Sequence, residues 1–386
     1  MPVLVFIAQI GMGLLILMFL VVIHELGHAI VARRNGVNVK EFGIGFPPKF
    51  ASVVLKNKIL LSLNWLPLGG FVRLQGENDA ANKKGDYGAA PLWVKTKILL
   101  AGVGMNWFFA MFVFTLLAVI GMPKVIPNQF TVPSDTKEVQ TPLKVTFVSQ
   151  GSPAEKIGLK VNDRIVSVAD KKIMQPDDLV GITDQNQGKR VEVKYLRDGQ
   201  TFAVYVQLRY KPHAEKGVLG VATSSQTVRY STWSAPIVGV GTTVQFSAMT
   251  LQGLGDLIGK LSSGIASQLS GDKAQREKGS QEISAAGNSV GGPLSIVGVF
   301  FPAAQNAGTS TLLFLTAIIS LTLAVMNILP IPALDGGRLF LTLLFRAIKK
   351  PLTKDIEDSI VGYSFMALMG LVVIITIADV FKIQSL

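Results

Sequence analysis

Two histidines and a glutamate lie close together at the end of the first apolar run of the chain. The segment reads His24-Glu25-Leu26-Gly27-His28. On a helix, His24 and His28 are four residues apart and share one face, so their imidazoles could hold one Zn²⁺ ion. Zinc lowers the pKa of a bound water toward neutrality, and the Glu25 carboxylate could take its proton as a general base. The motif therefore predicts a metal-dependent hydrolytic site.

The same motif also fits a purely structural role, because histidine and glutamate at the end of an apolar helix can simply meet the membrane interface. Two facts favour the metal. The whole chain has three histidines, and two of them belong to this motif. Ionisable groups inside a membrane span are unfavourable and usually functional. We therefore expect His24 and His28 to bind a metal ion.

A catalytic zinc ion typically has three protein ligands and one open position. The chain has no cysteine, and its third histidine, His213, falls in a polar segment typical of a soluble module. We therefore expect the third ligand to be a carboxylate near another span. Asp335 is the candidate, because it follows an apolar helix that Pro330 and Pro332 interrupt, and irregular backbone at membrane depth lines a cavity or the protein interior. Composition alone fits a turn at the membrane interface equally well. The membrane topology expected from the basic residues favours a ligand role for Asp335, because it places Asp335 and the two histidines near the same, cytoplasmic side.

Composition places the chain among membrane proteins. Hydrophobic residues make up 49% of it and charged residues 16%, and its mean hydropathy is +0.43. A helix needs about 20 apolar residues to cross a bilayer. The first run has no basic stretch before it and no small-residue cleavage site after it, so it predicts a retained helix and not a cleaved signal peptide. We expect transmembrane helices over residues 1–34, 98–122, 311–340 and 359–380.

Basic residues near the ends of these runs predict their orientation. They gather in residues 33–40, 95–97 and 338–350. Because basic residues favour cytoplasmic segments, residues 33–97 and 335–358 should be cytoplasmic, with both termini and the large middle region outside. The net charge of +12 then indicates a basic surface near anionic lipid. Nucleic acid is not expected as a partner, because no basic stretch is interleaved with aromatic residues.

The segments between the expected transmembrane helices differ in composition and in their pattern of apolar and polar residues. Residues 35–97 contain short apolar pieces punctuated by glycines such as Gly43 and Gly45, which predicts a β-hairpin or small sheet followed by a polar loop. Residues 142–223 alternate β-rich pieces with turns, as in a soluble α+β domain. Residues 232–304 are rich in small polar residues and predict an amphipathic segment on the membrane surface, with a loop at 271–291.

At this point the motifs resemble those of the site-2 protease family of intramembrane zinc metalloproteases, of the regulator-of-sigma-E-protease type. H-E-L-G-H resembles the HExxH of that family, and N-I-L-P-I-P-A-L-D-G-G resembles its NxxPxPxLDG. The resemblance covers nearly the whole chain, and residues 151–168 with V-L-G-V resemble a single PDZ module. The remaining matches are F-G-I-G-F (42–46), P-L-G-G-F-V-R-L-Q-G-E (67–77), A-G-V-G-M-N (101–106) and G-P-L-S-I (292–296).

The resemblance implies a fold class and a set of roles. The fold is a polytopic α-helical membrane protein with about four transmembrane helices, a small membrane-associated β-sheet and one soluble α+β PDZ domain. His24, His28 and Asp335 would ligate zinc, and Glu25 would be the general base. Asn106 and Asn327 would either bind the substrate or the oxyanion, or make ordinary hydrogen bonds between helices. The hairpin that contains Gly43 and Gly45 would hold an extended substrate by β-addition.

The implied function is intramembrane endoproteolysis. The substrates would be transmembrane segments of single-span membrane proteins, such as anti-sigma-factor-like proteins or remnant signal peptides, cut during regulated intramembrane proteolysis. The enzyme would lie in the lipid bilayer of the bacterial inner membrane as a multi-pass protein. Its active site would face the cytoplasmic side, and its PDZ domain would be extracytoplasmic.

Other functions fit parts of the sequence. A metal transporter could use the same histidines as a transit site, although transporters usually show internal repeats, which we do not find here. A membrane-anchored PDZ scaffold would explain residues 142–223 but not two distant motifs with metal-ligand chemistry. A metalloprotease of the prenyl-protein-processing type shares HExxH, but its third ligand is a glutamate on a helix, which residues 334–336 do not provide.

Overall fold

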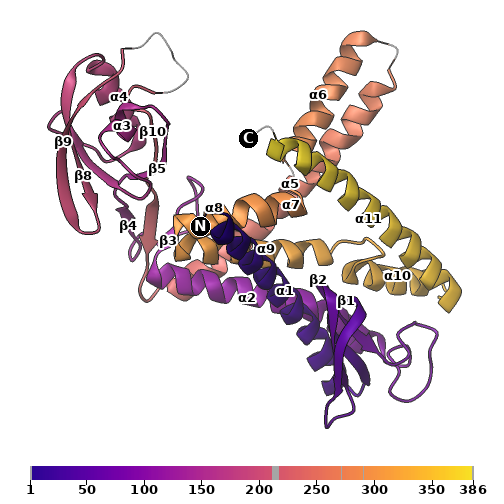
Figure 1. Cartoon of the computed structure of the whole chain (residues 1–386). Coiled ribbons are helices and arrows are strands. Elements are labelled where there is room, and N and C mark those ends of the chain that lie inside the picture. The colour runs from indigo at the N-terminus through magenta and orange to yellow at the C-terminus, as the bar shows by residue number, and fades with distance from the viewer. Residues whose placement is uncertain (1, 211–216, 271, 290, 385–386) are drawn as a thin grey trace. The chain divides into compact units, whose positions relative to one another are not determined.

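The computed structural model describes residues 2–210, 217–270, 272–289 and 291–384 (Figure 1). His213, which we expect outside the metal site, lies outside the described residues. The chain forms two compact units, which are described separately. Unit 1 contains Met1–Leu117 and Ala235–Leu386, and unit 2 contains Ala118–Ser234.

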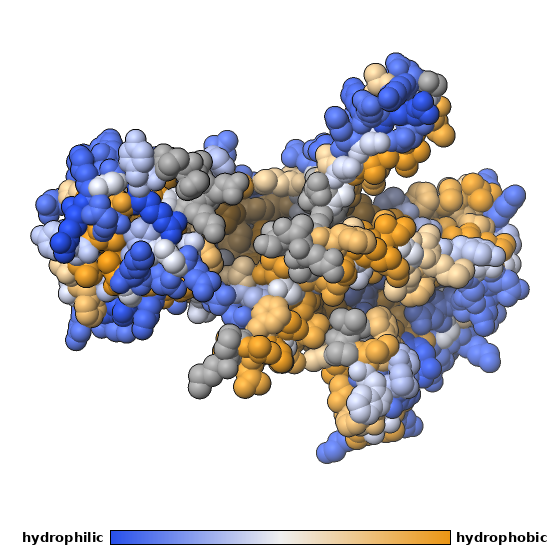
Figure 2. Space-filling model, turned by 45° about the horizontal axis from the view of Figure 1, so that its top comes forward, coloured by the Kyte–Doolittle hydropathy of each residue, from blue (hydrophilic) through white to orange (hydrophobic). Residues whose placement is uncertain are grey.

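Unit 1 is built around long apolar helices. Four helices in the described part of the chain are long and apolar enough to cross a membrane, in agreement with the expected number. Many of their large apolar side chains are exposed, and Figure 2 shows hydrophobic patches over the helical part of the surface. A bilayer would cover these side chains, which are unfavourable in water. The four helices are α1 (Pro2–Arg34), α2 (Leu92–Ile120), α9 (Thr309–Asn327) and α11 (Lys354–Gln384).

The third expected span, residues 311–340, is not one helix. α9 ends at Asn327, and a second helix, α10, begins at Asp335 and ends at Ala347. The break follows from the prolines between them, which lack the amide hydrogen that a helix needs. The turn packs tightly on α10, because a Cβ atom on Gly337 would come within 1.9 Å of the Ile331 carbonyl oxygen. The polypeptide therefore reverses next to Asp335, and glycine is required there.

The loop expected at 271–291 is also wrong, because the structure has a helix there. α5 (Ala235–Gln268) and α6 (Lys273–Ser289) pack side by side (Figure 1). A Cβ atom on Gly279 would lie 2.7 Å from the Gly264 carbonyl oxygen, so the two glycines allow close approach of the helix backbones. The small residues that suggested a loop thus form a helix contact. Shorter helical segments follow: α7 (Pro293–Ser295), η2 (Ile296–Phe300) and α8 (Phe301–Ala307).

Two long antiparallel strands form the sheet expected in residues 35–97. They are β1 (Val39–Val54) and β2 (Leu60–Leu74). Both strands bend, so that residues 41–44 of β1 pair with 60–63 on one side and with 70–73 on the other. The sheet therefore has four rows, with residues 70–74 at one edge and 49–54 at the opposite edge. No other described strand pairs with either edge.

The sheet packs against the C-terminal part of α1 and the start of α2. Buried apolar side chains from all three elements form one core, which also includes Tyr87 from the segment between β2 and α2. This core fixes where the row 70–74 lies relative to the histidines on α1. Its members are Ala29, Ala32, Val37, Val39, Ile59, Leu74, Tyr87, Ile98 and Leu99.

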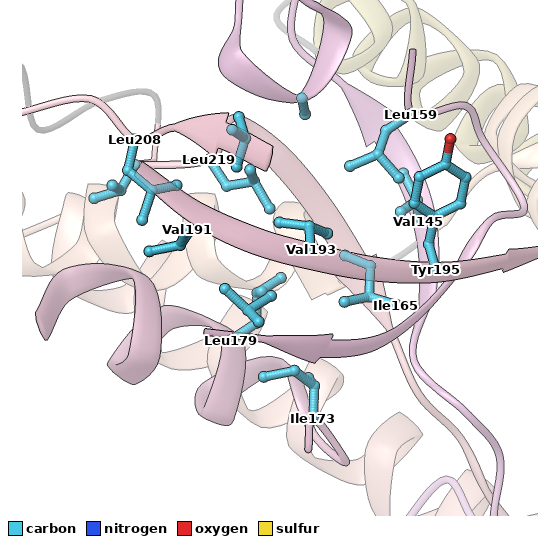
Figure 3. Close-up of a cluster of buried hydrophobic side chains, with 14 of the residues drawn as sticks. Val145, Leu159, Ile165, Ile173, Leu179, Val191, Val193, Tyr195, Leu208 and Leu219 are labelled. Atoms are coloured by element: carbon cyan, nitrogen blue, oxygen red, sulfur yellow. The ribbon is translucent and has the colours of Figure 1, made fainter. Parts of the chain in front are cut away.

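Unit 2 contains the expected soluble α+β region. Its larger sheet has the strand order β10-β5-β6-β8-β9, with β7 paired to β6, and its core is formed by aliphatic side chains and Tyr195 (Figure 3). The strands are β5 (Lys144–Val148), β6 (Arg164–Val168), β7 (Lys171–Lys172), β8 (Arg190–Arg197), β9 (Gln200–Gln207) and β10 (Val221–Ser224). The helices are α3 (Pro153–Lys156) and α4 (Pro176–Gln185). That this region is a PDZ domain stays a prediction.

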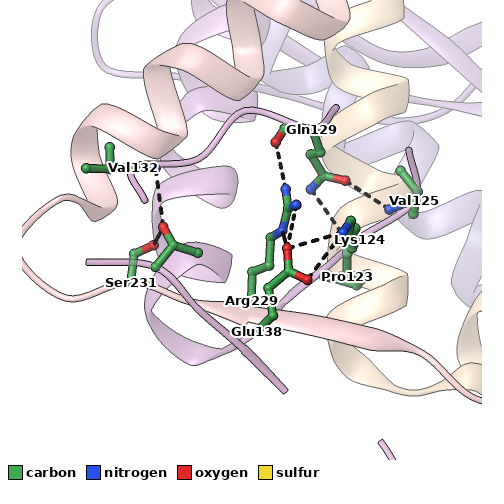
Figure 4. Close-up of polar contacts among 9 residues, drawn as sticks. Pro123, Lys124, Val125, Gln129, Val132, Glu138, Arg229 and Ser231 are labelled. Atoms are coloured by element: carbon green, nitrogen blue, oxygen red, sulfur yellow. Dashed lines mark hydrogen bonds and ion pairs between the residues drawn. The ribbon is translucent and has the colours of Figure 1, made fainter. Parts of the chain in front are cut away.

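A second, three-stranded sheet in unit 2 joins β3 (Met122–Pro123), β11 (Thr227–Tyr230) and β4 (Lys137–Gln140). Polar contacts hold it together (Figure 4). Arg229 donates to Glu138 Oε1 at 2.8 Å and to the Gln129 carbonyl at 2.6 Å. The hydrogen bonds from Arg229 and Lys124 hold the pKa of Glu138 below its usual value, so this carboxylate stays charged.

Candidate metal centre

Three metal-binding side chains come together where α1 meets the start of α10. His24 and His28 lie one turn apart on α1, and Asp335 is the first residue of α10. His24 Nε2 lies 3.0 Å and His28 Nε2 3.2 Å from Asp335 Oδ2, and the two Nε2 atoms are 3.1 Å apart. The structure thus brings together the three residues that the sequence predicts as ligands.

The separation of these atoms fits a zinc ion. Zinc binds histidine nitrogen and carboxylate oxygen at about 2.0–2.2 Å in tetrahedral geometry, which places ligand atoms roughly 3.3–3.6 Å apart. The observed distances of 3.0, 3.1 and 3.2 Å are close to that value. Among the residues that the structure describes, this is the one group of three or more histidine or acidic side chains that could hold a metal ion.

The ring of His28 is oriented by α2. Its Nδ1 atom donates a hydrogen bond of 2.7 Å to the main-chain carbonyl of Ile98. A proton on Nδ1 leaves the lone pair on Nε2, and Nε2 is the atom that points at Asp335. His24 differs, because its Nδ1 atom is buried without a hydrogen-bond partner among the described residues.

Two glycines allow α1 and α2 to approach each other at the centre. A Cβ atom on Gly102 would come within 2.4 Å of His28 Nε2 and 2.6 Å of His24 Cε1. A Cβ atom on Gly27 would lie 2.5 Å from the Ala101 carbonyl oxygen. Gly102 therefore leaves open the space beside the imidazoles. The sequence alone predicts no site role for Gly102, although it lies in the A-G-V-G-M-N stretch that resembles the family pattern.

Glu25 faces a cavity beside the three ligands. The cavity has a volume of ≈ 190 Å³ and is lined by His28 and Asp335 as well as by Glu25, Val72 and Leu74. The Glu25 side chain also lies against the edge row of β2, since a Cβ atom on Gly70 would be 3.5 Å from Glu25 Cγ. The cavity therefore borders both the candidate base and the free edge of the sheet.

Arg338 extends this arrangement toward the segment that follows β2. It donates from Nη1 to Glu77 Oε1 at 3.0 Å and from Nη2 to the Glu77 carbonyl at 3.0 Å. Its guanidinium also lies 5.9 Å from the centre of the Tyr87 ring. These contacts hold the first turn of α10, which carries Asp335. The sequence predicts no role for either residue, although Glu77 is the last residue of the family-like stretch 67–77 and Arg338 directly follows the stretch 327–337.

The other expected site residues are not part of the lining of this cavity. Asn106 is fully buried, and neither its amide nitrogen nor its amide oxygen has a partner among the described residues. Asn327 donates to the Leu323 carbonyl of its own helix at 3.0 Å. Gly43 and Gly45 lie in β1, where Gly45 has a φ of 78° and packs against the Leu66 carbonyl. Their roles stay predictions.

Comparison with known proteins gives a consistent result. The model of peptidase family M50 matches residues 12–371. A protein of Clostridium perfringens, named as a candidate zinc metalloprotease, is 30% identical and covers 94% of this chain and 95% of its own length. The regulator of sigma-W protease RasP of Bacillus subtilis is 26% identical. It covers 92% of this chain and 94% of its own length.

Solved structures also match part of the chain. One example is the PDZ domain of an SdrC-like protein from Listeria monocytogenes, at 16% identity and a TM-score of 0.19, and it covers 21% of this chain and 86% of its own. A likeness at that TM-score carries no argument about unit 2. The family match spans most of the chain, so this protein belongs to peptidase family M50, the site-2 protease family.

Proposed function

We propose that His24, His28 and Asp335 bind the zinc ion of this metalloprotease and that Glu25 is its general base. The observation that carries the proposal is the convergence of three ligand atoms, 3.0–3.2 Å apart, from two helices distant in sequence. Two histidines and one carboxylate leave one position of a tetrahedral ion open, which is typical of catalytic and not of structural zinc.

The chain's own residues supply the proton transfers. A zinc ion held by these three residues would supply a Lewis acid, which would polarise the scissile carbonyl and make water a stronger acid. The Glu25 carboxylate accepts the proton of the attacking water, and it returns that proton to the nitrogen that leaves when the C–N bond breaks. For Asn106 we propose a hydrogen bond to the substrate backbone, because its buried amide has unused donors and acceptors.

The substrates that we propose are transmembrane segments of single-span membrane proteins. A helical segment uses its amides in its own hydrogen bonds, so it must unwind before its carbonyl can be attacked. The row 70–74 of β2 supports this step, because its outer edge has no strand partner among the described residues and it borders the cavity of Glu25. An extended substrate strand could add to that edge, with the Gly43–Gly45 hairpin beside it.

We further propose that the metal centre lies toward the cytoplasmic side of a bacterial inner membrane. The basic residues Arg33 and Arg34 at the end of α1 support this orientation. The region 142–223 would then be extracytoplasmic and, together with residues 232–304, would exclude large substrates. We propose anti-sigma-factor-like proteins and remnant signal peptides as the two classes of substrate; the Bacillus subtilis relative is named as a regulator of sigma-W protease.

Metal content tests the ligand set. We expect about one zinc per purified wild-type chain. The D335A variant should lose most of it, whereas D355A, which removes an exposed acid from the first turn of α11, should keep it. Retention of a full zinc complement by D335A would show that Asp335 is not a ligand.

Cleavage tests the role of Glu25. The E25Q variant should keep its zinc and lose cleavage of a tagged single-span substrate in proteoliposomes by at least about a hundredfold. Cleavage by E25Q at the wild-type rate would refute Glu25 as the base. Zinc flux into vesicles that depends on His24, without proteolysis, would instead favour the transporter.

A further inference from the structure

A groove separate from the metal centre lies between the C-terminal part of α1 and the β1–β2 sheet. Its volume is ≈ 630 Å³, within the range of about 300–1,000 Å³ that is common for small-molecule sites. Along α1 its lining extends from Val22 to Arg34. At 1.5 Å per residue this is roughly 18 Å, slightly more than the roughly 15 Å of hydrocarbon in one leaflet of a bilayer.

The polar and apolar parts of the groove are separated along its length. Arg33 and Arg34, at the end of α1, and Asn57, in the turn between β1 and β2, are the polar residues of the lining. All the others are apolar; they include Val22, Leu26 and Ile30 from α1, Phe42 and Leu61 from the sheet, and Leu55, which directly follows β1. The groove therefore has the polarity of an amphiphile, with a charged end and an apolar wall.

The two arginines have no acidic partner in the part of the chain that the structure describes. Both are exposed. Glu41 is the one acidic residue between positions 39 and 74, and it is already bonded to Lys49 at 2.9 Å and to Arg73 at 2.8 Å. Burial acts to raise the pKa of Glu41, but hydrogen bonds from Lys49 and Ser62 hold it below its usual value. The Glu41 carboxylate is therefore paired with Lys49 and Arg73, and it is not a partner of Arg33 or Arg34.

We propose that this groove binds one anionic phospholipid, with an acyl chain along the apolar wall and the phosphate between the guanidinium groups of Arg33 and Arg34. Guanidinium groups bind phosphate through two parallel hydrogen bonds. An apolar groove that ends in unpaired arginines suits a charged lipid better than a zwitterionic one, because anionic headgroups attract basic residues near the membrane surface. The lipid would contact and stabilise the end of α1, because Arg33 and Arg34 lie less than two helical turns after His28.

Lipid binding to the full chain in detergent tests the proposal. Native mass spectrometry would count bound dioleoylphosphatidylglycerol and dioleoylphosphatidylcholine, which have the same acyl chains. We expect the anionic lipid to bind about tenfold more tightly. The R33Q/R34Q variant should lose that preference, whereas K349Q/K350Q, which removes the same charge from an exposed segment between α10 and α11, should keep it.

A second variant tests the apolar wall. L55W fills the groove from the turn between β1 and β2 and leaves both arginines in place, so it should weaken binding of the anionic lipid by about tenfold. Size-exclusion chromatography would verify that each variant is folded. Equal affinity for the two lipids, or equal loss in R33Q/R34Q and K349Q/K350Q, would overturn the proposal. So would competition by glycerol phosphate, which would reveal a simple anion site, or displacement of the lipid by a substrate peptide that binds the groove.

Discussion

The Nδ1 atom of His28 on α1 donates a 2.7 Å hydrogen bond to the carbonyl of Ile98 on α2, 70 residues later. This bond ties the orientation of a proposed zinc ligand to the position of a second helix. The distance between α1 and α2 is in turn set by glycines, because a side chain on Gly27 or Gly102 would collide with the neighbouring helix. The metal centre therefore depends on residues that do not bind the metal.

Substitution of Gly102 by alanine should disrupt the metal centre. The added methyl group would lie 2.4 Å from His28 Nε2, so the imidazoles must move away from their ligand positions. We expect zinc affinity to fall by about tenfold to a hundredfold, as measured by competition with a chelator. The matched control is G104A, since a Cβ atom on Gly104 meets nothing within 4 Å. Equal affinities of the two variants would contradict this explanation.

Arg338 should be needed to position Asp335. Lysine cannot reproduce the two hydrogen bonds that Arg338 makes to Glu77. We expect R338K to reduce kcat/KM by about tenfold to a hundredfold and to weaken zinc binding as well. R346K is the control, because Arg346 is an exposed residue of the same helix. If R338K and R346K behave alike, the contacts of Arg338 have no role in positioning.

Cleavage should depend on how easily the substrate helix unwinds. A pair of glycines at the scissile site lowers helix stability by roughly 1 kcal/mol per residue relative to alanine, and the extended form is the one that can add to the row 70–74. We expect cleavage to become several times faster. The same pair placed near the other end of the substrate span should have little effect. A rate that is insensitive to position would argue against binding at the sheet edge.

The stability of unit 2 should depend on the ionisation of Asp163. Burial acts to raise its pKa, but hydrogen bonds from Arg197 and from the Lys160 amide hold it below the usual value. A lowered pKa stabilises the fold above the unfolded-state value of about 3.9, and this stabilisation disappears as the pH falls through the folded-state pKa. D163N should therefore destabilise unit 2 at neutral pH by about 1–3 kcal/mol, and by less at pH 3, which lies below the unfolded-state pKa of about 3.9.

Hydrogen exchange in the full chain can measure this difference. Exchange of β6 in D163N would be compared with the wild type at the same pH, so that intrinsic rates cancel. The control is D170N, because the Asp170 side chain is 83% exposed and lies 3.6 Å from Lys194. A destabilisation by D163N that is the same at both pH values would mean that its charge is not the cause.

The sequence was informative where chemistry restricts residue type. The HExxH motif supplies two zinc ligands and the Leu-Asp-Gly turn supplies one. Because a catalytic zinc typically has three protein ligands, the sequence predicts that the two motifs lie next to each other. The helix α6 could not be predicted, because Gly279 looks like a loop residue until its close contact with Gly264 of α5 is known. The same limit applies to Gly102, since only the α1–α2 packing shows that it adjoins the imidazoles. Residues 41–44 of β1 pair with two parts of β2, residues 60–63 and 70–73. An apolar and polar pattern can predict a strand, but it does not show which segments pair with it.

His24 and Asp335 are 311 positions apart in the chain. If zinc is held by all three proposed ligands, a ribosome that has made the first two spans has produced both imidazoles and the base but no third ligand. The peptidase would then remain inert throughout most of its own translation. A nascent or truncated copy would be harmless to its neighbours in the membrane, because the order of synthesis withholds the last ligand until the C-terminal quarter has inserted.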